Sequence, residues 1–248
     1  MILHQLQTCH KSRVAFYSIS ILIFFSSLLL IAPEQSGQVL GSVRSWIGET
    51  FGWFYMVSVS SFILCLLYCG FSRAGDLRLG KENDRPAFSR FSWSSMLFCT
   101  GMGIGLVFFG VAEPVMHYMS PPVGEAQTAE AARSAMKLTF FHWGINAWAI
   151  YATVGLSISY MVYRRGRAIE MRSILFSLVG DKANGRLGDA VDTFAVCATV
   201  MGIVTPLGFG VMQMNAGLNY MFGIEVGLST QLFLITVIAL ITFISLTL

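Results

Sequence analysis

Charged residues are scarce in this sequence. Only 12% of its 248 residues are Asp, Glu, Lys or Arg, about half the share in a typical soluble domain. Hydrophobic residues make up 55%, and the mean hydropathy is +0.66. This composition leaves no room for a sizeable soluble domain and excludes most soluble enzymes. A net charge of +3 is also too small for a nucleic-acid-binding surface, so we expect no nucleic-acid partner.

Clustered metal ligands and disulfide spacings are missing as well. Cys65 and Cys69 lie one helical turn apart but have no histidine or acid beside them. The other cysteines, Cys9, Cys99 and Cys197, are scattered, and all but Cys9 fall in apolar runs. We therefore predict free thiols, no metal site and no cofactor. No nucleophile and base pair is visible, which argues against an enzyme.

Apolar runs of spanning length predict an all-α membrane protein with six transmembrane helices. The first run is long for a signal peptide and lacks a small-x-small cleavage site before Pro33, so we interpret it as an anchor. The six predicted spans are Val14–Ala32, Gly52–Phe71, Ser94–Val115, Leu138–Tyr163, Ala190–Tyr220 and Gly227–Leu248.

The basic residues between these runs are distributed very unevenly. Thirteen lie in the N-terminus and in the 72–93 and 164–189 loops, whereas the opposite side holds only Arg44, Arg133 and Lys137. The positive-inside rule then places the N-terminus and both basic loops in the cytoplasm. Within the second loop, apolar residues from Ile169 to Val179 predict a short interfacial helix that ends at Gly180. The last run ends at Leu248 without a polar tail, so we expect a fragment.

The third run has four glycines within ten residues, Gly101, Gly103, Gly105 and Gly110. These glycines could form a small-residue face that lets another helix approach closely. Alternatively, the helix is broken here and presents free backbone groups to a substrate or cation, as in many transporters. The residues alone leave both interpretations open.

The fourth run contains Trp143, Trp148 and Tyr151, which lie in one sector of a continuous helix at about 100° per residue. Such rings could hold a quaternary ammonium group by cation–π interaction. Tryptophan and tyrosine also form interfacial belts and fill cores, so this spacing does not decide between the two roles.

The fifth run mixes Thr199, Thr205, Pro206 and several glycines, which makes it a second candidate for an irregular helix. Its threonines could also bond back to their own helix. The acids nearest the membrane are Glu113 and Asp192, and both lie near span ends, where a capping or interfacial role competes with a functional one.

Several segments together resemble the betaine/carnitine/choline transporter family. The likeness runs from about Phe51 to Tyr220 and implies a twelve-span protein, typically trimeric, with two leading helices followed by two inverted five-helix repeats of the LeuT type. The chain would then comprise a cytoplasmic N-terminus (1–13), the two leading helices with their loop (14–93) and a partial first repeat (94–248). The segments are Arg85–Phe98, Gly101–Gly105 with Glu113 and Pro114, and Phe141–Trp143 with Trp148 and Tyr151.

The resemblance also assigns roles to residues. Trp143, Trp148 and Tyr151 match half of the family's aromatic substrate box, with Gly101, Met102, Gly103 and Gly105 as the neighbouring substrate-binding backbone. Cys99 and Met102 match one sodium site of sodium-coupled members, and Thr199 matches a second. That second site has Ile203 where those members carry another threonine, which favours proton coupling. Gly105 replaces an aspartate frequent in choline-type members and favours a zwitterion.

We therefore expect part of a secondary transporter for glycine betaine or choline, coupled to H⁺ or Na⁺. The alternative is a six-span structural or regulatory membrane subunit without transport activity. The two hypotheses differ in whether six more spans, one of them rich in tryptophan, are expected after Leu248.

Overall fold

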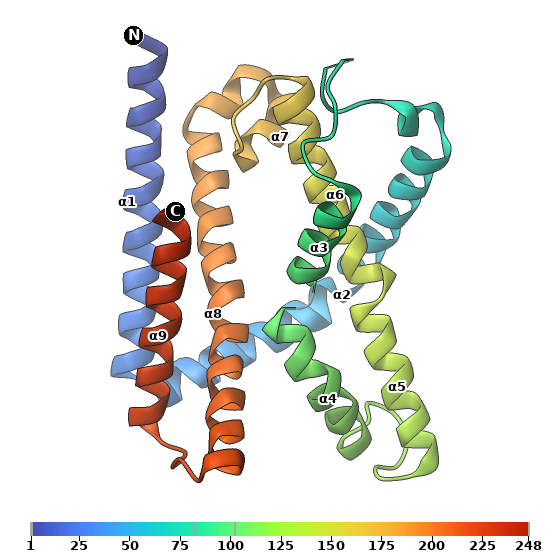
Figure 1. Cartoon of the computed structure of the whole chain (residues 1–248), viewed down its shortest axis with the longest axis vertical. Helices are drawn as coiled ribbons and strands as arrows, with labels where there is room; N and C mark the ends of the chain where they lie inside the picture. Colours follow the sequence, from blue (N-terminus) through green and yellow to red (C-terminus); the bar gives the residue numbers. More distant parts are fainter. Residues whose placement is uncertain (1, 82, 102, 248) are drawn as a thin grey trace. The chain divides into compact units, whose positions relative to one another are not determined.

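The structure is a computed structural model that describes residues 2–81, 83–101 and 103–247, with side chains from residue 12 onward except those of Thr100 and Ile104. The described residues form helices joined by turns and by loops of varied length (Figure 1). Single turns of other helix types lie at Arg73–Asp76, Tyr160–Arg164 and Gly180–Asn184. The α-helices are α1 (Ile2–Ile31), α2 (Pro33–Phe71), α3 (Arg90–Gly101), α4 (Ile104–Met119), α5 (Ala129–Trp143), α6 (Ile145–Ser159), α7 (Met171–Val179), α8 (Arg186–Phe222) and α9 (Leu228–Thr247).

Five helical stretches in the described part of the chain are long and apolar enough to cross a membrane. They lie at Ser12–Ile31, Pro33–Phe71, Ala129–Arg164, Arg186–Phe222 and Leu228–Thr247. The prediction of an all-α membrane protein is confirmed, but the count of six continuous spans is not. The difference lies in the run Ser94–Val115, which is divided between α3 and α4, each shorter than a membrane-spanning helix.

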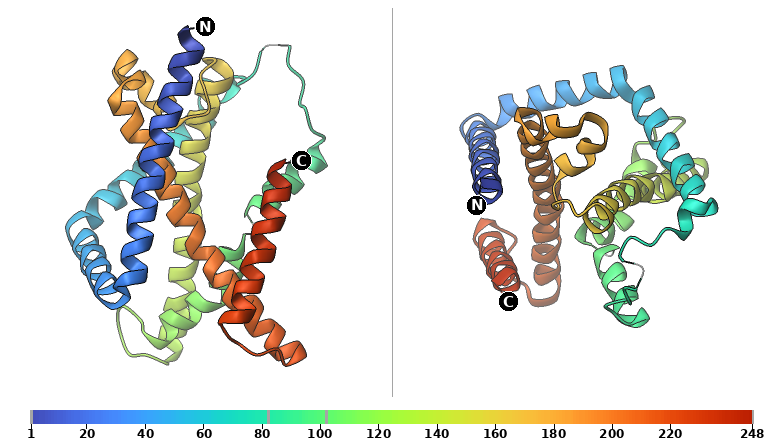
Figure 2. Two further views of the ribbon diagram at one scale, coloured as in Figure 1. Left: turned by 90° about the vertical axis from the view of Figure 1, so that its left-hand side faces the viewer. Right: turned by 90° about the horizontal axis from the view of Figure 1, so that it is seen from above.

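The second helix is longer than predicted. The sequence indicated a span beginning at Gly52, whereas α2 is helical from Pro33 onward. At about 1.5 Å per residue its 39 residues are nearly twice the thickness of a bilayer core. Figure 2 shows α2 changing direction along its length. The part before Gly52 therefore extends the helix beyond what one crossing needs.

The chain forms two compact units. The first contains residues up to 85 together with 140–199. In it α2 packs against α6, and α1 contacts α8 through Ser18, whose carbonyl accepts a hydrogen bond from the Cys197 thiol (3.9 Å). Gly188 allows the beginning of α8 to pass close to the preceding turn, because a Cβ atom there would lie 1.9 Å from the carbonyl oxygen of Ala183.

The second unit contains residues 86–139 and those from 200 onward. Within it the Phe108 ring of α4 stacks on Phe209 of α8, with ring centroids 4.8 Å apart. The reversal from α8 to α9 is fixed by Asn215, which is fully buried. Its side chain donates to the Glu225 carbonyl (3.3 Å) and accepts from the Gly227 amide (3.2 Å).

Most large apolar side chains in the described residues point outward. The buried hydrophobic positions are mainly small residues such as Ala131, Ala135 and Ala149, while many Phe, Leu, Ile and Trp side chains are exposed. A soluble domain would bury these side chains, whereas a bilayer solvates them. This pattern, with the five spanning stretches, identifies a multi-pass membrane protein.

Candidate functional site

The aromatic residues of the fourth run lie on both sides of a helix break. Helix α5 ends at Trp143 and α6 begins at Ile145, with Gly144 between them. A side chain at this position is excluded, because a Cβ atom on Gly144 would lie 2.4 Å from the carbonyl oxygen of Phe140. The predicted continuous helix over Leu138–Tyr163 is therefore wrong at Gly144, and the angles expected between Trp143 and the later rings do not apply.

Two of the three predicted box residues form a ring pair on α6. The ring centroids of Trp148 and Tyr151 are 5.9 Å apart, and the ring planes are inclined by 44°. Trp143 joins this pair through its backbone, because the indole N–H of Trp148 donates to the Trp143 carbonyl across the break (3.0 Å). The Trp143 ring itself lies 5.3 Å from the ring of His142. The hydrogen bond across the break thus fixes the edge of the Trp148 indole and does not use the face of the ring.

The exposed ring faces are suited to a cation. Trp148 and Tyr151 are 51% and 73% exposed. A quaternary ammonium group is attracted by the negative ring faces without needing a buried carboxylate, and each ring contributes about 0.5 to 2 kcal/mol. The two rings are inclined to each other on one helix, and a role for them in binding a cation is a prediction.

The glycine-rich third run is a broken helix, the second of the two interpretations that the sequence left open. Helix α3 ends at Gly101, Gly103 is extended (φ −71°, ψ 168°), and α4 begins at Ile104. The Gly103 carbonyl accepts the Leu106 and Val107 amides (3.1 and 3.3 Å). No atom outside the immediate backbone lies within 4 Å of where a Gly103 Cβ would be, so the low helix propensity of the glycines accounts for the break better than crowding does.

The predicted cation-coupling residues are distributed as follows. Cys99 is exposed and lies on α3, in the second unit with Gly101, Gly103 and Gly105. Thr199 is exposed on α8 and belongs to the first unit with the aromatic residues. Met102 lies outside the described residues. Because these groups fall in two separately described units, whether they form one site remains a prediction.

The fifth run is not irregular. Helix α8 continues from Arg186 to Phe222 through Pro206 and the glycines. The Thr205 hydroxyl donates to the Met201 carbonyl (3.2 Å), which is the back-bonding that the sequence left as an alternative. Ile203 is exposed on this helix and offers only hydrocarbon. The regular helix therefore provides no unwound backbone around Thr199 and Ile203.

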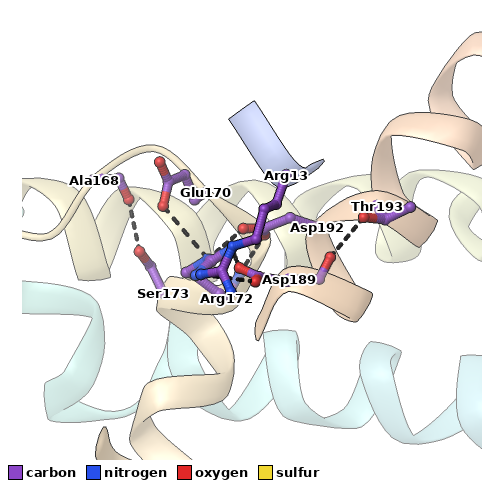
Figure 3. A network of polar contacts seen from close by, with 8 residues as sticks. All are labelled: Arg13, Ala168, Glu170, Arg172, Ser173, Asp189, Asp192 and Thr193. Atoms are coloured by element: carbon purple, nitrogen blue, oxygen red, sulfur yellow. Dashed lines mark hydrogen bonds and ion pairs between the residues drawn. The ribbon is translucent and has the colours of Figure 1, made fainter. Parts of the chain in front are cut away.

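The two acids nearest the membrane have different surroundings. Glu113 is buried within α4, and its carboxylate lies 3.5 Å from the His117 imidazole one turn later. Asp192 belongs to a buried ion network at the beginning of α8 (Figure 3). Neither acid is an N-cap. Both acids lie inside a helix and not at its first residue, so the capping role that the sequence left open does not apply.

Arg172 on α7 is the centre of that network, and it is 5% exposed. Its guanidinium donates to the carboxylates of Asp189 (2.8 Å) and Asp192, and its backbone N–H donates to Asp192 (2.9 Å). Arg13 of α1 lies 3.2 Å from Asp189, and the Glu170 carboxylate lies 3.7 Å from Arg172. The network therefore joins α1, α7 and α8 within the first unit (Figure 3).

Burial of the Arg172 guanidinium lowers its pKa, but the hydrogen bonds to Asp192 and Asp189 and their negative charges outweigh this effect. The net result is a pKa above the ordinary arginine value. Arg172 therefore stays charged and compensates two buried carboxylates. This role is not evident from the sequence, in which Arg172 is one of several basic residues in a loop. The i, i+3 spacing of Asp189 and Asp192 at the beginning of an apolar helix was the signal that could have indicated it.

The short helix in the second basic loop is confirmed. Helix α7 ends at Val179, and Gly180 follows with φ +57°, a left-handed conformation that glycine adopts without strain. Within α7, Ile174 and Leu175 are partly buried and Leu178 is 82% exposed. Ile169, which was expected on the same apolar face, lies before the helix and is 76% exposed. Exposed apolar side chains beside a membrane span are typical of an interfacial helix.

Comparison with known proteins decides the family. Residues 13–248 match the family model described as BCCT, betaine/carnitine/choline family transporter. The chain belongs to this family. A glycine betaine transporter from Acinetobacter baylyi is 46% identical over 222 residues, which cover 90% of this chain and 34% of the relative. The resemblance seen in the glycine and aromatic motifs is thereby confirmed.

Other relatives in the family carry two kinds of name. The glycine betaine transporter OpuD of Bacillus subtilis is 46% identical over 87% of this chain and 42% of its own length. A high-affinity choline transport protein of Escherichia coli is 40% identical over 94% of this chain and 35% of its own length. This BCCT chain thus spans between a third and a half of the length of these relatives, all of which are named as transporters and not as enzymes.

Proposed function

We propose that this chain forms the N-terminal part of a secondary transporter for trimethylammonium compounds. The observation that carries the proposal is the Trp148 and Tyr151 ring pair, exposed and only 5.9 Å apart, on a helix that belongs to this family. Trp143, fixed to the pair by the indole hydrogen bond, completes the half-box. These three residues hold the ammonium headgroup of the substrate.

The broken third helix supplies the second element of the proposed site. Gly101, Gly103 and Gly105 lie at or beside the break between α3 and α4, and breaks of this kind bind polar ligands in many transporters. The family resemblance adds Met102, which lies outside the described residues. Gly105 adds no charge, and a substrate with its own carboxylate needs no counter-charge from the protein. Glycine betaine is therefore favoured over choline as the substrate.

We further propose that transport is coupled to protons and not to sodium bound at Thr199. Sodium is a hard cation that needs several oxygen ligands. Ile203, one turn after Thr199, provides no side-chain oxygen, and the helix places the carbonyls of these two residues opposite the amides of Ile203 and Leu207. Pro206 has no N–H for the Gly202 carbonyl, but one free carbonyl and the Thr199 hydroxyl are too few ligands for sodium. Cys99 and Met102 are candidates for a separate cation site, which would also require further oxygen ligands.

The assembled protein works by alternating access, as a trimer in the bacterial inner membrane, with the N-terminus and both basic loops in the cytoplasm. The region 14–93 forms the leading helices, and the region from 94 onward belongs to the first repeat. The remaining part of the site then comes from a second repeat that completes the aromatic box.

Uptake measurements test this function. The chain would be joined to the part of the Acinetobacter baylyi relative that follows the aligned region, and produced in cells without betaine or choline uptake of their own. Saturable uptake of labelled glycine betaine by the hybrid, with none by the 248-residue chain alone, is expected. A hybrid that reaches the membrane but transports neither betaine nor choline would contradict the transporter function. Saturable uptake by the chain alone would contradict the need for a second repeat.

A further inference from the structure

A small polar cavity lies where the fourth spanning stretch meets the second basic loop. It has a volume of about 390 Å³ and is lined by Met161, Arg165, Arg167, Phe176 and Ser177. All five residues belong to the first unit, and none of them belongs to the aromatic half-box or to the Arg172 network. The transporter function proposed above makes no use of this cavity.

The backbone after α6 brings the two arginines to the same cavity. The last turn is a π-helical turn, and Gly166 follows it with φ +65°. This left-handed residue reverses the chain between Arg165 and Arg167. The amides of Arg165 and Arg167 donate to the carbonyls of Tyr160 (3.2 Å) and Met161 (2.9 Å). The carbonyls of Tyr160 and Met161 therefore already accept backbone amides.

Neither arginine forms an ion pair in the described part of the chain. The Arg167 guanidinium lies over the Phe176 ring, 3.2 Å from its centroid, and that of Arg165 lies 5.9 Å from the centroid of Tyr160. Aromatic faces hold a guanidinium in place but do not neutralise its charge. Both groups retain N–H donors and a full positive charge for an anion.

The wall of the cavity supplies a hydroxyl and an apolar floor. The Ser177 hydroxyl donates to the Met161 thioether sulfur (3.4 Å), which is a weak acceptor that a phosphate oxygen would readily replace. Met161 and Phe176 provide apolar surface. Two guanidinium groups, one hydroxyl and adjacent apolar surface suit a phosphate ester better than a carboxylate, because a phosphate offers more acceptor oxygens to these donors.

The position of the cavity indicates where the phosphate comes from. Arg165 directly follows the spanning stretch Ala129–Arg164, at the level where phospholipid headgroups lie. Tyr163 is exposed there, as in an interfacial aromatic belt, and α7 exposes Leu178 toward the same medium. We propose that Arg165, Arg167 and Ser177 form a binding site for the phosphate of an anionic phospholipid headgroup, such as that of phosphatidylglycerol.

Lipid binding to the purified 248-residue chain tests the proposal. Native mass spectrometry would count phosphatidylglycerol and phosphatidylcholine retained by the wild type and by the variant Arg165→Gln/Arg167→Gln. The matched control is Arg73→Gln/Arg186→Gln, which removes two exposed arginines of the same unit that do not line the cavity. We expect the cavity variant to lose affinity for phosphatidylglycerol by about tenfold or more, with the control close to wild type.

Two further arms complete the test. Inorganic phosphate, added without lipid, should not protect the chain against thermal unfolding. Protection by millimolar phosphate that the cavity variant loses would overturn the lipid assignment in favour of a soluble phosphate. Arg167→Lys keeps the charge over Phe176 and is expected to fold and to bind phosphatidylglycerol at intermediate affinity. Equal losses of phosphatidylglycerol affinity in the cavity and control variants would overturn the site. The site would also be overturned if the cavity variant bound phosphatidylglycerol as tightly as wild type and Arg167→Lys folded and did the same.

Discussion

Replacing Arg172 by glutamine should strongly destabilise the first unit. The substitution removes the charge that faces Asp189 and Asp192, both less than 10% exposed. Asp189 keeps only Arg13, whose side chain is 47% exposed, and Asp192 keeps the backbone N–H of residue 172. Breaking a buried ion pair by removing one partner costs about 3 to 5 kcal/mol, because the remaining charges are left uncompensated.

The free energy of unfolding would be measured in mixed micelles as the fraction of sodium dodecyl sulfate is raised. Arg13→Gln is the matched control, since it removes an equal charge from the exposed end of the same network and should cost about 0 to 1 kcal/mol. The double variant Arg172→Gln/Asp192→Asn should regain about 1 to 3 kcal/mol relative to Arg172→Gln, because a neutral pair replaces a buried charge. A cost for Arg172→Gln no larger than that of Arg13→Gln would refute the buried network.

Three other predictions follow from the structure. Gly188→Ala should destabilise the chain by about 1 to 3 kcal/mol, since its Cβ would collide with the Ala183 carbonyl. Gly202→Ala on the same helix has open space around it and should not destabilise the chain. Equal effects of the two substitutions on thermal unfolding would contradict the close approach at Gly188. In a background without the native thiols, Ala74→Cys should resist an impermeant reagent added outside intact cells and Gln38→Cys should react, and the reverse pattern would invert the topology. Uptake by the hybrid transporter should persist without sodium. The proton-coupled account would be disproved if uptake strictly required sodium and Thr199→Ala abolished uptake while substrate binding survived.

The sequence predicted the helical class and most helix positions because membrane spans are read from long apolar runs. It did not predict the early beginning of α2 at Pro33. That segment contains Glu34, Arg44 and Glu49, and these charges lower its hydropathy although they do not prevent helix formation. Hydropathy measures the preference for lipid, not the tendency to form a helix, so a polar helical extension is invisible to it.

The breaks in the third and fourth runs show a similar limit. Four glycines in the third run raised two alternatives, and only the backbone angles at Gly103 decided for the broken helix. The sequence does not indicate a break at Gly144, because a single glycine is common in transmembrane helices. What makes it a break is its close approach to the Phe140 carbonyl, a contact that depends on three-dimensional structure.

The geometry of the aromatic residues was predicted only in part. Trp148 and Tyr151 were expected to be neighbours, and they form a ring pair, because both lie on the unbroken part of α6. Trp143 lies beyond the break and joins through its carbonyl instead of its position on a common helix. The Arg172 network could not be predicted, since it depends on contacts between residues far apart in sequence, such as Arg13 and Asp189.

The most direct test of the central claim is the apparent affinity of the hybrid transporter for glycine betaine and choline after Trp148→Leu, which keeps the apolar bulk and removes the aromatic face. Losing one ring should raise the KM for uptake by roughly two- to thirtyfold. Trp53→Leu, which removes an exposed tryptophan on α2, serves as the matched control and should leave the KM unchanged. An unchanged KM for both substrates in a well-expressed Trp148→Leu hybrid would contradict the claim that these rings hold the ammonium group.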